Sequence, residues 1–207
     1  MPRAVSLAAL VAAMLLVLAS SAPAEKKKPS LIEVAVAKAF PGAKVERVCL
    51  RLSEAELKKV GKRASQRAPK KSTTFAYVAR KDGKVVGTAF FDSHIVRTKR
   101  ETLMVVVTPE GKVADVETIV FQEPPEWLAQ DSFYDSLAGR GQGRALILGR
   151  GLDGTTGATL TCRAVADASR RVLALHEVGG ERVGRIKPAP KEARQGSGGD
   201  EDPGPQG

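Results

Sequence analysis

The sequence predicts an α+β fold in which a small antiparallel sheet of two hairpins packs against helices. Three observations lead to this prediction. Alternating apolar and polar segments occur as two pairs, at 75–79 with 85–91 and at 103–108 with 113–121. Apolar residues recur at helical spacing on both sides of these pairs. A loop rich in glycine and threonine leads directly into the last helical pattern, so its hydroxyls are expected at the N-terminus of the C-terminal helix.

The N-terminal residues are not expected to belong to this fold. Residues 1–24 combine a short positive start, an apolar run from Ala4 to Ala19 and a small-residue site, Ala22-Pro23-Ala24, which is typical of a secretory signal peptide. The apolar run is also close to the length of an uncleaved membrane anchor. We expect cleavage, no membrane span in the mature chain, and a periplasmic or otherwise extracytosolic location.

The rest of the 207-residue chain divides into three parts by composition. Residues 25–30 form a basic leader, and residues 187–207 contain mostly proline, glycine and charged side chains, which predicts a disordered tail. Residues 31–186 lie between them and are numerous enough for one domain with its own core.

Two helices are predicted before the sheet. The first follows Ser30, carries an apolar stripe from Ile32 to Phe40 and stops before a Pro-Gly pair. The second starts at Ser53, because Ser53 and Glu56 have the spacing of a capping box. A basic run follows, and it consists of Lys58, Lys59, Lys62, Arg63, Arg67, Lys70 and Lys71. This run is either a solvated loop or a site for an acidic partner; no aromatic residue interleaves it, and export also argues against nucleic acid.

The two hairpins are predicted from their turns. Asp82-Gly83 joins the first pair of strands and is a strong hairpin signal, and Pro109-Glu110-Gly111 joins the second pair. His94, just after the first pair, is interpreted as a surface residue at a strand end. The final helix is predicted over residues 162–175, with Cys162, Val165 and equivalent positions facing the core.

The two cysteines, Cys49 and Cys162, leave two alternatives open. An extracytosolic location permits a disulfide between them, but two buried thiols explain the sequence equally well. The only histidines, His94 and His176, have no spacing that would join the thiols in a metal site.

The stretch 153–161 reads DGTTGATLT and leads into the last helix. The opening amides of a helix have no intrahelical partners and carry the positive end of its dipole, so they can bind a phosphate. Gly157 allows a close approach of the backbone, and Ala158 is small. Plain capping is the alternative, with Thr161 as the N-cap and the other threonines in a polar turn.

The same stretch resembles the flavinylation motif of the FMN-binding domain family, which occurs in peripheral subunits of the sodium-translocating NADH:quinone reductase, in Rnf-type electron-transport complexes and in related exported redox proteins. In that family an aspartate stands three residues before a Ser/Thr-Gly-Ala-Thr core, and here these are Asp153 and Thr156-Gly157-Ala158-Thr159. The order of elements over residues 31–175 is also similar. Residues 122–127 depart from the family, because several relatives carry a Glu-Thr-Pro-Gly-type loop at this point.

The resemblance implies covalent FMN, attached through its phosphate to Thr159 by a separate exported flavin transferase that uses FAD. Thr156 and Thr161 would then hydrogen-bond the phosphate, and Thr161 is the fallback acceptor of the flavin. Asp153 would be recognised by the transferase or bridge a metal ion; the alternative is that it caps the loop. The implied protein is an electron carrier whose redox partner is a membrane electron-transport complex or a cytochrome. An extracytosolic flavin-dependent oxidoreductase, a regulatory flavin domain and a cofactor-free basic binding module are the alternatives.

Overall fold

The computed structural model describes residues 29–185, so the predicted signal peptide, most of the basic leader and the tail lie outside the described residues. The helices and strands are α2 (Leu31–Ala39), β1 (Lys44–Arg51), α3 (Glu54–Ala64), β2 (Thr73–Lys81), β3 (Lys84–Ile95), β4 (Arg100–Val107), β5 (Val113–Phe121), α4 (Asp131–Asp135) and α5 (Thr159–Gly179). Short 3-10 helices cover Pro125–Trp127, Arg144–Leu146 and Gly180–Val183.

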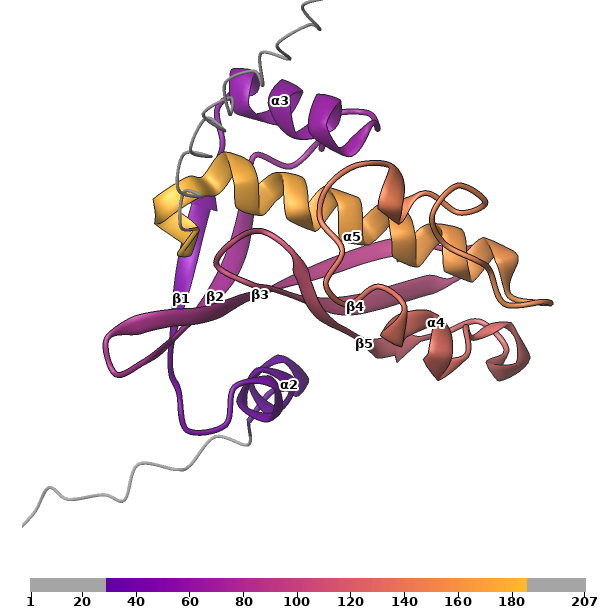
Figure 1. Ribbon diagram of the computed structural model, residues 1–207, viewed down its shortest axis with the longest axis horizontal. Coiled ribbons are helices and arrows are strands. Elements are labelled where there is room, and N and C mark those ends of the chain that lie inside the picture. Colours follow the sequence, from indigo (N-terminus) through magenta and orange to yellow (C-terminus); the bar gives the residue numbers. More distant parts are fainter. Residues whose placement is uncertain (1–28, 186–207) are drawn as a thin grey trace, which may run out of the picture. The chain divides into compact units, whose positions relative to one another are not determined.

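The predicted α+β fold is confirmed. The sheet has five strands in the order β1-β2-β3-β4-β5, and each strand is antiparallel to its neighbour (Figure 1). The hairpins β2–β3 and β4–β5 are the two that the sequence predicts. At the first turn, Asp82 and Gly83 both have positive φ, of 51° and 76°, as a tight hairpin turn requires. The edge strand β1 was not predicted; among its residues only Leu50 is buried.

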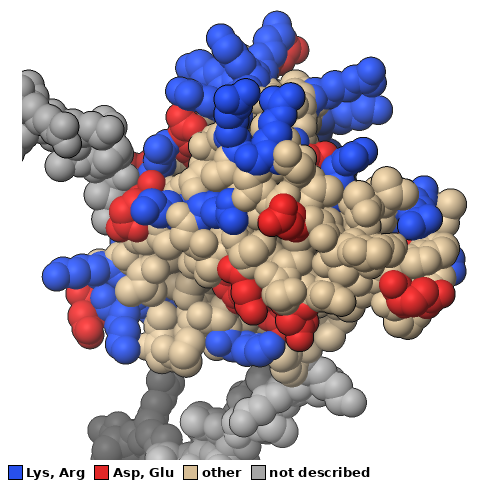
Figure 2. All heavy atoms as spheres, turned by 45° about the vertical axis from the view of Figure 1, so that its right-hand side comes forward, with Lys and Arg blue, Asp and Glu red and all other residues tan. Residues whose placement is uncertain are grey.

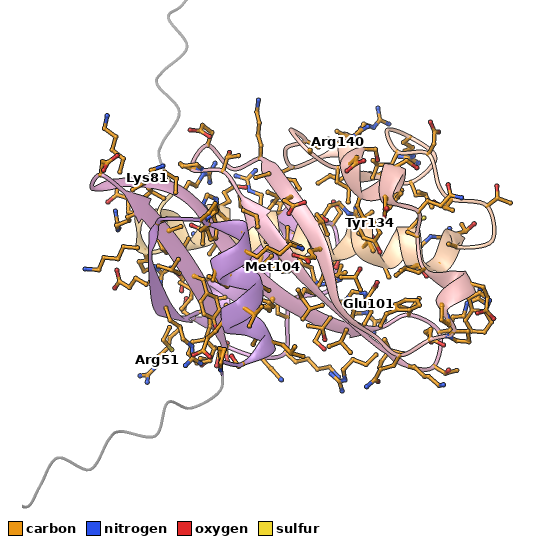
Figure 3. All side chains as sticks on the ribbon, turned by 90° about the horizontal axis from the view of Figure 1, so that it is seen from below. Arg51, Lys81, Glu101, Met104, Tyr134 and Arg140 are labelled. Atoms are coloured by element: carbon orange, nitrogen blue, oxygen red, sulfur yellow. The ribbon has the colours of Figure 1, made fainter. Side chains whose placement is uncertain are left out.

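The sheet carries a core on each face. On one face α5 and α3 pack over β-strand residues such as Phe90 and Val105, and this face holds the main core. On the other face α2 forms a second, smaller core (Figures 1 and 3). Phe40, just after α2, approaches β3 closely, because a Cβ at Gly87 would lie only 2.9 Å from the Phe40 ring. Glycine at that position therefore lets the second core close.

The start of α3 confirms the predicted capping box. Ser53 Oγ accepts a hydrogen bond from the Glu56 amide at 3.3 Å, and Glu56 Oε2 accepts one from the Ser53 amide at 2.8 Å. The helix continues to Ala64, so the first four residues of the basic run, from Lys58 to Arg63, lie on a helix rather than in a solvated loop. Figure 2 shows lysine and arginine side chains gathered at the top of the molecule, where α3 lies in Figure 1.

The cysteines do not form a disulfide. Cys49 is exposed on β1, whereas Cys162 is buried in the main core under α5. Of the two alternatives that the sequence left open, the bridge is therefore wrong, and only one of the two thiols is buried. Within residues 29–185, no helix has the length and apolar character that crossing a bilayer requires.

Candidate functional site

The threonine-rich motif forms the turn before α5 and the first residues of that helix. α5 begins at Thr159, three residues earlier than predicted, with Ala158 as its N-cap residue. Gly157 has φ of +84°, a conformation that glycine adopts without strain, and nothing lies within 4 Å of the position of an added Cβ. Ala158 is buried in the main core, while Thr156 and Thr159 are exposed. The motif is therefore anchored by Ala158 and presents Thr156 and Thr159 at the surface.

The first turn of α5 has free backbone amides. The first helical hydrogen bond is the one from the Cys162 amide to the Ala158 carbonyl, at 2.9 Å. Among the described residues, no backbone carbonyl accepts from the amides of Thr159, Leu160 and Thr161, and no side chain caps the helix. The first turn of α5 also contains no acidic residue. α3, with its complete capping box, differs in this respect. The start of α5 thus offers donors and positive dipole to an anion.

Thr161 is buried and hydrogen-bonded, unlike the exposed Thr159. Its side chain is only 1% exposed, and its hydroxyl donates a hydrogen bond to the Trp127 carbonyl at 2.5 Å. The prediction that Thr161 caps the helix is wrong, because α5 has already begun two residues earlier. As a hydrogen-bond donor Thr161 holds the 3-10 turn at Pro125–Trp127 against α5. Thr159 is the exposed hydroxyl of the pair.

A polar hollow of about 360 Å³ lies beside the motif. One side of the hollow is formed by the first four motif residues, Asp153, Gly154, Thr155 and Thr156. The other lining residues come from α4 and the loops beside it, and they are Gln130, Ser132, Phe133, Ser136, Arg140 and Gly151. Thr159 is not among the lining residues, although it follows Thr156 by three positions. The hollow therefore brings the first half of the motif together with α4 and the loop after it.

Arg140 is a fixed cation in the wall of this hollow. Its Nε donates to the Ser136 carbonyl, and its Nη1 donates to the carbonyls of Gly151 and Ala145, the last at 2.9 Å. These bonds join the end of α4 to the loop before the motif. No sequence pattern pointed to this residue, because its three acceptors are backbone carbonyls from separate parts of the chain.

The aromatic residues near the motif have different environments. Phe133 is buried in the main core, and Tyr134 is half-buried, with its hydroxyl 3.0 Å from the Thr118 hydroxyl. Burial raises the pKa of Tyr134 to about 12, so the phenol stays protonated. Trp127 is partly exposed, with the Arg97 guanidinium 4.2 Å from the centre of its ring. Of the three rings, Phe133 is buried, while Trp127 is partly exposed and has Arg97 over its ring.

The loop before Trp127 is held by a buried carboxyl group. Glu123 Oε1 accepts hydrogen bonds from the amides of Lys99 and Thr98, both at 2.7 Å, and from that of Arg97 at 3.1 Å. These bonds, the one from Lys99 foremost, lower the pKa of Glu123. Glu123 thereby fixes the turn between β3 and β4. In the stretch that departs from the family pattern, this glutamate has a structural role.

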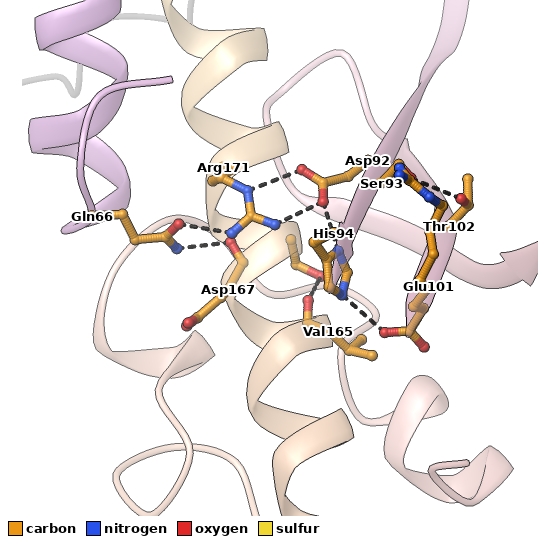
Figure 4. A network of polar contacts seen from close by, with 11 residues as sticks. Gln66, Asp92, Ser93, His94, Glu101, Thr102, Val165, Asp167 and Arg171 are labelled. Atoms are coloured by element: carbon orange, nitrogen blue, oxygen red, sulfur yellow. Dashed lines mark hydrogen bonds and ion pairs between the residues drawn. The ribbon is translucent and has the colours of Figure 1, made fainter. Parts of the chain in front are cut away.

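A polar network lies under α5, and the sequence did not predict it (Figure 4). His94 Nδ1 lies 2.8 Å from Asp92 Oδ1, and His94 Nε2 lies 2.9 Å from Glu101 Oε2. Arg171 of α5 donates to both oxygens of Asp92, at 2.9 and 2.7 Å, and to Gln66 at 2.9 Å. The interpretation of His94 as a surface residue is wrong, since its side chain is 14% exposed and both ring nitrogens are bonded.

Protonation of the network follows from its contacts. Burial lowers the pKa of His94, but hydrogen bonds to Asp92 and Glu101 outweigh this effect and raise it to about 9. Burial raises the pKa of Asp92, whereas bonds to His94 and Arg171 outweigh burial and bring it to about 2. A usable signal was present in the sequence: Asp92 and His94 are two apart on a strand and so share a face. Their partner Glu101, opposite His94 in the sheet register, has no such local signal.

Fold and site together define an α+β domain with an anion-accepting helix start beside a polar hollow. Residues 98–174 match the model of the FMN-binding domain family. The family predicted from the motif is therefore confirmed for this part of the chain. The match runs from the turn before β4 into α5 and includes the whole motif. No curated protein matches the chain.

The residues present fit the phosphate end of FMN. Three amides without a partner in residues 29–185 and an exposed hydroxyl meet at the start of α5, and these are groups that bind a phosphate. Asp153 fits less well, because its exposed carboxyl group would repel the same phosphate. Among residues 29–185, no group of three or more histidine, cysteine or acidic side chains is placed to hold a metal ion.

Proposed function

We propose that the protein is an exported flavoprotein that carries FMN through a phosphoester to Thr159 and serves as an electron carrier outside the cytosol. The observation that carries the proposal is the contrast between two hydroxyls of one motif. Thr159 is exposed at the first residue of a helix whose opening amides are free. Thr161 is buried and bonded to a carbonyl. A transferase can reach only the first of them in the folded chain.

The attachment would be a displacement at phosphorus. The Thr159 hydroxyl oxygen forms a bond to the FMN phosphorus of FAD, AMP leaves, and the hydroxyl proton goes to a base. The amides of Thr159, Leu160 and Thr161 are then placed near the phosphate, where helix donors favour negative charge. Thr156, exposed in the turn before the helix, is the hydroxyl best placed to add a hydrogen bond. Asp153 is assigned to recognition by the transferase or to a metal ion bound with it.

A carrier role is favoured over a stand-alone enzyme. Flavin bound covalently cannot be lost by dilution outside the cytosol, and the flavin supplies the redox chemistry. Two ionisable side chains near the motif already have structural partners, since Glu123 holds a turn and Tyr134 is bonded to Thr118. The proposed redox partner is a membrane electron-transport complex or a cytochrome. The signal-peptide pattern of residues 1–24 supports export.

The test is made on protein exported by a host that has the transferase. The peptide containing Thr159 should gain the mass of FMN less water and fluoresce on a denaturing gel. Thr159→Val should abolish the fluorescence with the fold unchanged. Thr73→Val is the matched control, because it removes an exposed threonine hydroxyl on β2, outside the motif, and leaves the acceptor intact. Flavin that persists in Thr159→Val would refute the assignment, and its loss in Thr161→Val alone would move the acceptor to Thr161.

The same protein distinguishes carrier from enzyme. A carrier is reduced and reoxidised by protein partners, and shows no steady-state turnover with small-molecule substrates in their absence. Multiple turnover with a small molecule and no protein partner would favour the oxidoreductase alternative.

A further inference from the structure

The sheet splits between β2 and β3. Their ladder begins at the pair Ala76–Phe90 and runs toward the turn at Asp82. Beyond that pair, and within the part of the chain that the structure describes, residues 73–75 of β2 pair only with β1, and residues 91–95 of β3 pair only with β4. Figure 1 shows β1 and β2 turned steeply away from the ends of β3 and β4. Two strand segments with one free edge each therefore border a fork in the sheet.

The fork holds a cleft of about 1080 Å³. Both free segments line it, and its floor contains Leu52, Val172 and Leu175. Exposed apolar side chains also converge here: Phe75 is 40% exposed and Ile95 is 55% exposed, one on each side of the fork. The cleft is distinct from the hollow beside the motif, with which it shares no lining residue.

The rim of the cleft is positively charged. Four cationic side chains line it: Arg47, Arg67, Lys70 and Lys71. None of the four forms an ion pair within the described part of the chain. The Arg47 guanidinium lies over the Phe75 ring, 3.8 Å from its centre. The charged groups at the floor compensate one another, since Arg171 and His94 face the carboxyl groups of Asp92 and Glu101. The net charge offered to a ligand is therefore that of the four rim cations.

We propose that this cleft binds an extended acidic segment of a partner protein, which adds a strand at the free edge of β3 or β2 in the fork. Free strand edges provide backbone hydrogen bonds to such a segment. Phe75 and Ile95 receive its apolar side chains, and the four rim cations receive its carboxylates. The volume exceeds what most small-molecule sites enclose. The inference concerns residues outside the motif and is independent of flavin attachment.

The test uses the flavin-free protein and a short fluorescein-labelled peptide in which glutamate alternates with valine. Anisotropy should show saturable binding, and the same peptide with lysine for glutamate should not bind. The triple variant Arg67→Glu, Lys70→Glu, Lys71→Glu should weaken binding at least tenfold. Its matched control is Lys58→Glu, Lys59→Glu, Lys62→Glu, which changes the net charge equally on α3 outside the cleft. At physiological ionic strength, where charges beyond about 8 Å are screened, this control should bind as the wild type does.

Hydrogen exchange then tests the mode of binding. Bound peptide should slow exchange of amides in residues 91–95 or 73–75. Equal loss of binding in both triple variants would overturn the proposal in favour of unspecific charge attraction. Binding without protection of either edge would overturn strand addition. Dodecanoate serves as a small anionic amphiphile, and its binding with no binding of the peptide would assign the cleft to a small molecule instead.

Discussion

His176 is predicted to make the fold sensitive to mild acid. It lies in α5 with its side chain fully buried, and its ring meets Phe90 edge-on with ring centres 6.4 Å apart. Neither ring nitrogen has a hydrogen-bond partner among the described residues. Burial, followed by the charge of Arg185, lowers the pKa of His176 to about 4, against a smaller raising effect of Glu110. A proton on this ring therefore has no acceptor to stabilise it.

The sign of the effect follows from the two protonation states. The unfolded chain takes up the proton near the ordinary pKa of 6.5, before the folded chain does at about 4. Stability is thus fully present above pH 6.5 and is lost as the pH falls toward 4. The separation of the two pKa values corresponds to ~3 kcal/mol of unfolding free energy at low pH, of which ~2 kcal/mol is already lost at pH 4.5.

Urea unfolding of the wild type and of His176→Leu, at pH 7 and at about pH 4.5, measures this term. The stability of the wild type relative to the variant should fall by ~2 kcal/mol between the two pH values. His94 has the opposite sign: its pKa is raised, so its contribution is present below pH 6.5 and is lost as pH rises toward 9. This contribution is common to both proteins and cancels. Equal losses of stability in the two proteins would refute the reasoning.

Three further predictions follow from individual contacts. Thr161→Val should lower the free energy of unfolding by ~1–2 kcal/mol, because the Trp127 carbonyl loses its hydrogen-bond donor. The variant should retain the flavin, and loss of the flavin at unchanged stability would contradict this prediction. Electron transfer to an acidic redox partner should be slower at low salt when glutamate replaces Lys58, Lys59, Lys62 and Arg63, and the difference should fade as salt is added. Stopped-flow rates measure this effect. Equal rates at low salt would show that α3 does not guide the encounter. A thiol reagent should modify Cys49 in the folded protein and Cys162 only after unfolding, and mass spectrometry detects both modifications. If neither cysteine reacts after unfolding, the two form a disulfide and the prediction is wrong.

The sequence predicted those parts of the fold that have local signals. Asp82-Gly83 located the first hairpin, and the capping box located the start of α3. β1 was missed because an edge strand with one buried residue shows no clear alternation. β3 is longer than predicted, since its last residues are held by β4 alone and include a polar Asp-Ser-His stretch before Ile95. Strand segments that depend on pairing with distant strands are therefore not predicted from the sequence.

The candidate site divides in the same way. The motif residues could be found in the sequence because they are contiguous, and the family match includes them. The exposure of Thr159 and the burial of Thr161 could not be found there, because they depend on where α5 begins and on the distant Trp127 carbonyl. Arg140 is a similar case, since its acceptors are backbone carbonyls that carry no sequence pattern. A side chain's role that depends on backbone partners far along the chain can be assigned only from the structure.

The two proposals are linked through α5. Thr159 is the first residue of this helix, and Arg171, twelve residues later, lines the cleft in the fork of the sheet. At the rise of an α-helix, this separation is roughly 18 Å along one continuous element. The helix is packed against the sheet along its length, with Val165 and Val172 buried in the main core. A partner segment seated in the cleft would therefore be held at a fixed distance from Thr159, the proposed attachment point of the flavin. Docking in the fork would then position the redox partner without contact to the motif itself, so variants of the rim cations should change the rate of electron transfer and leave flavin attachment unaltered.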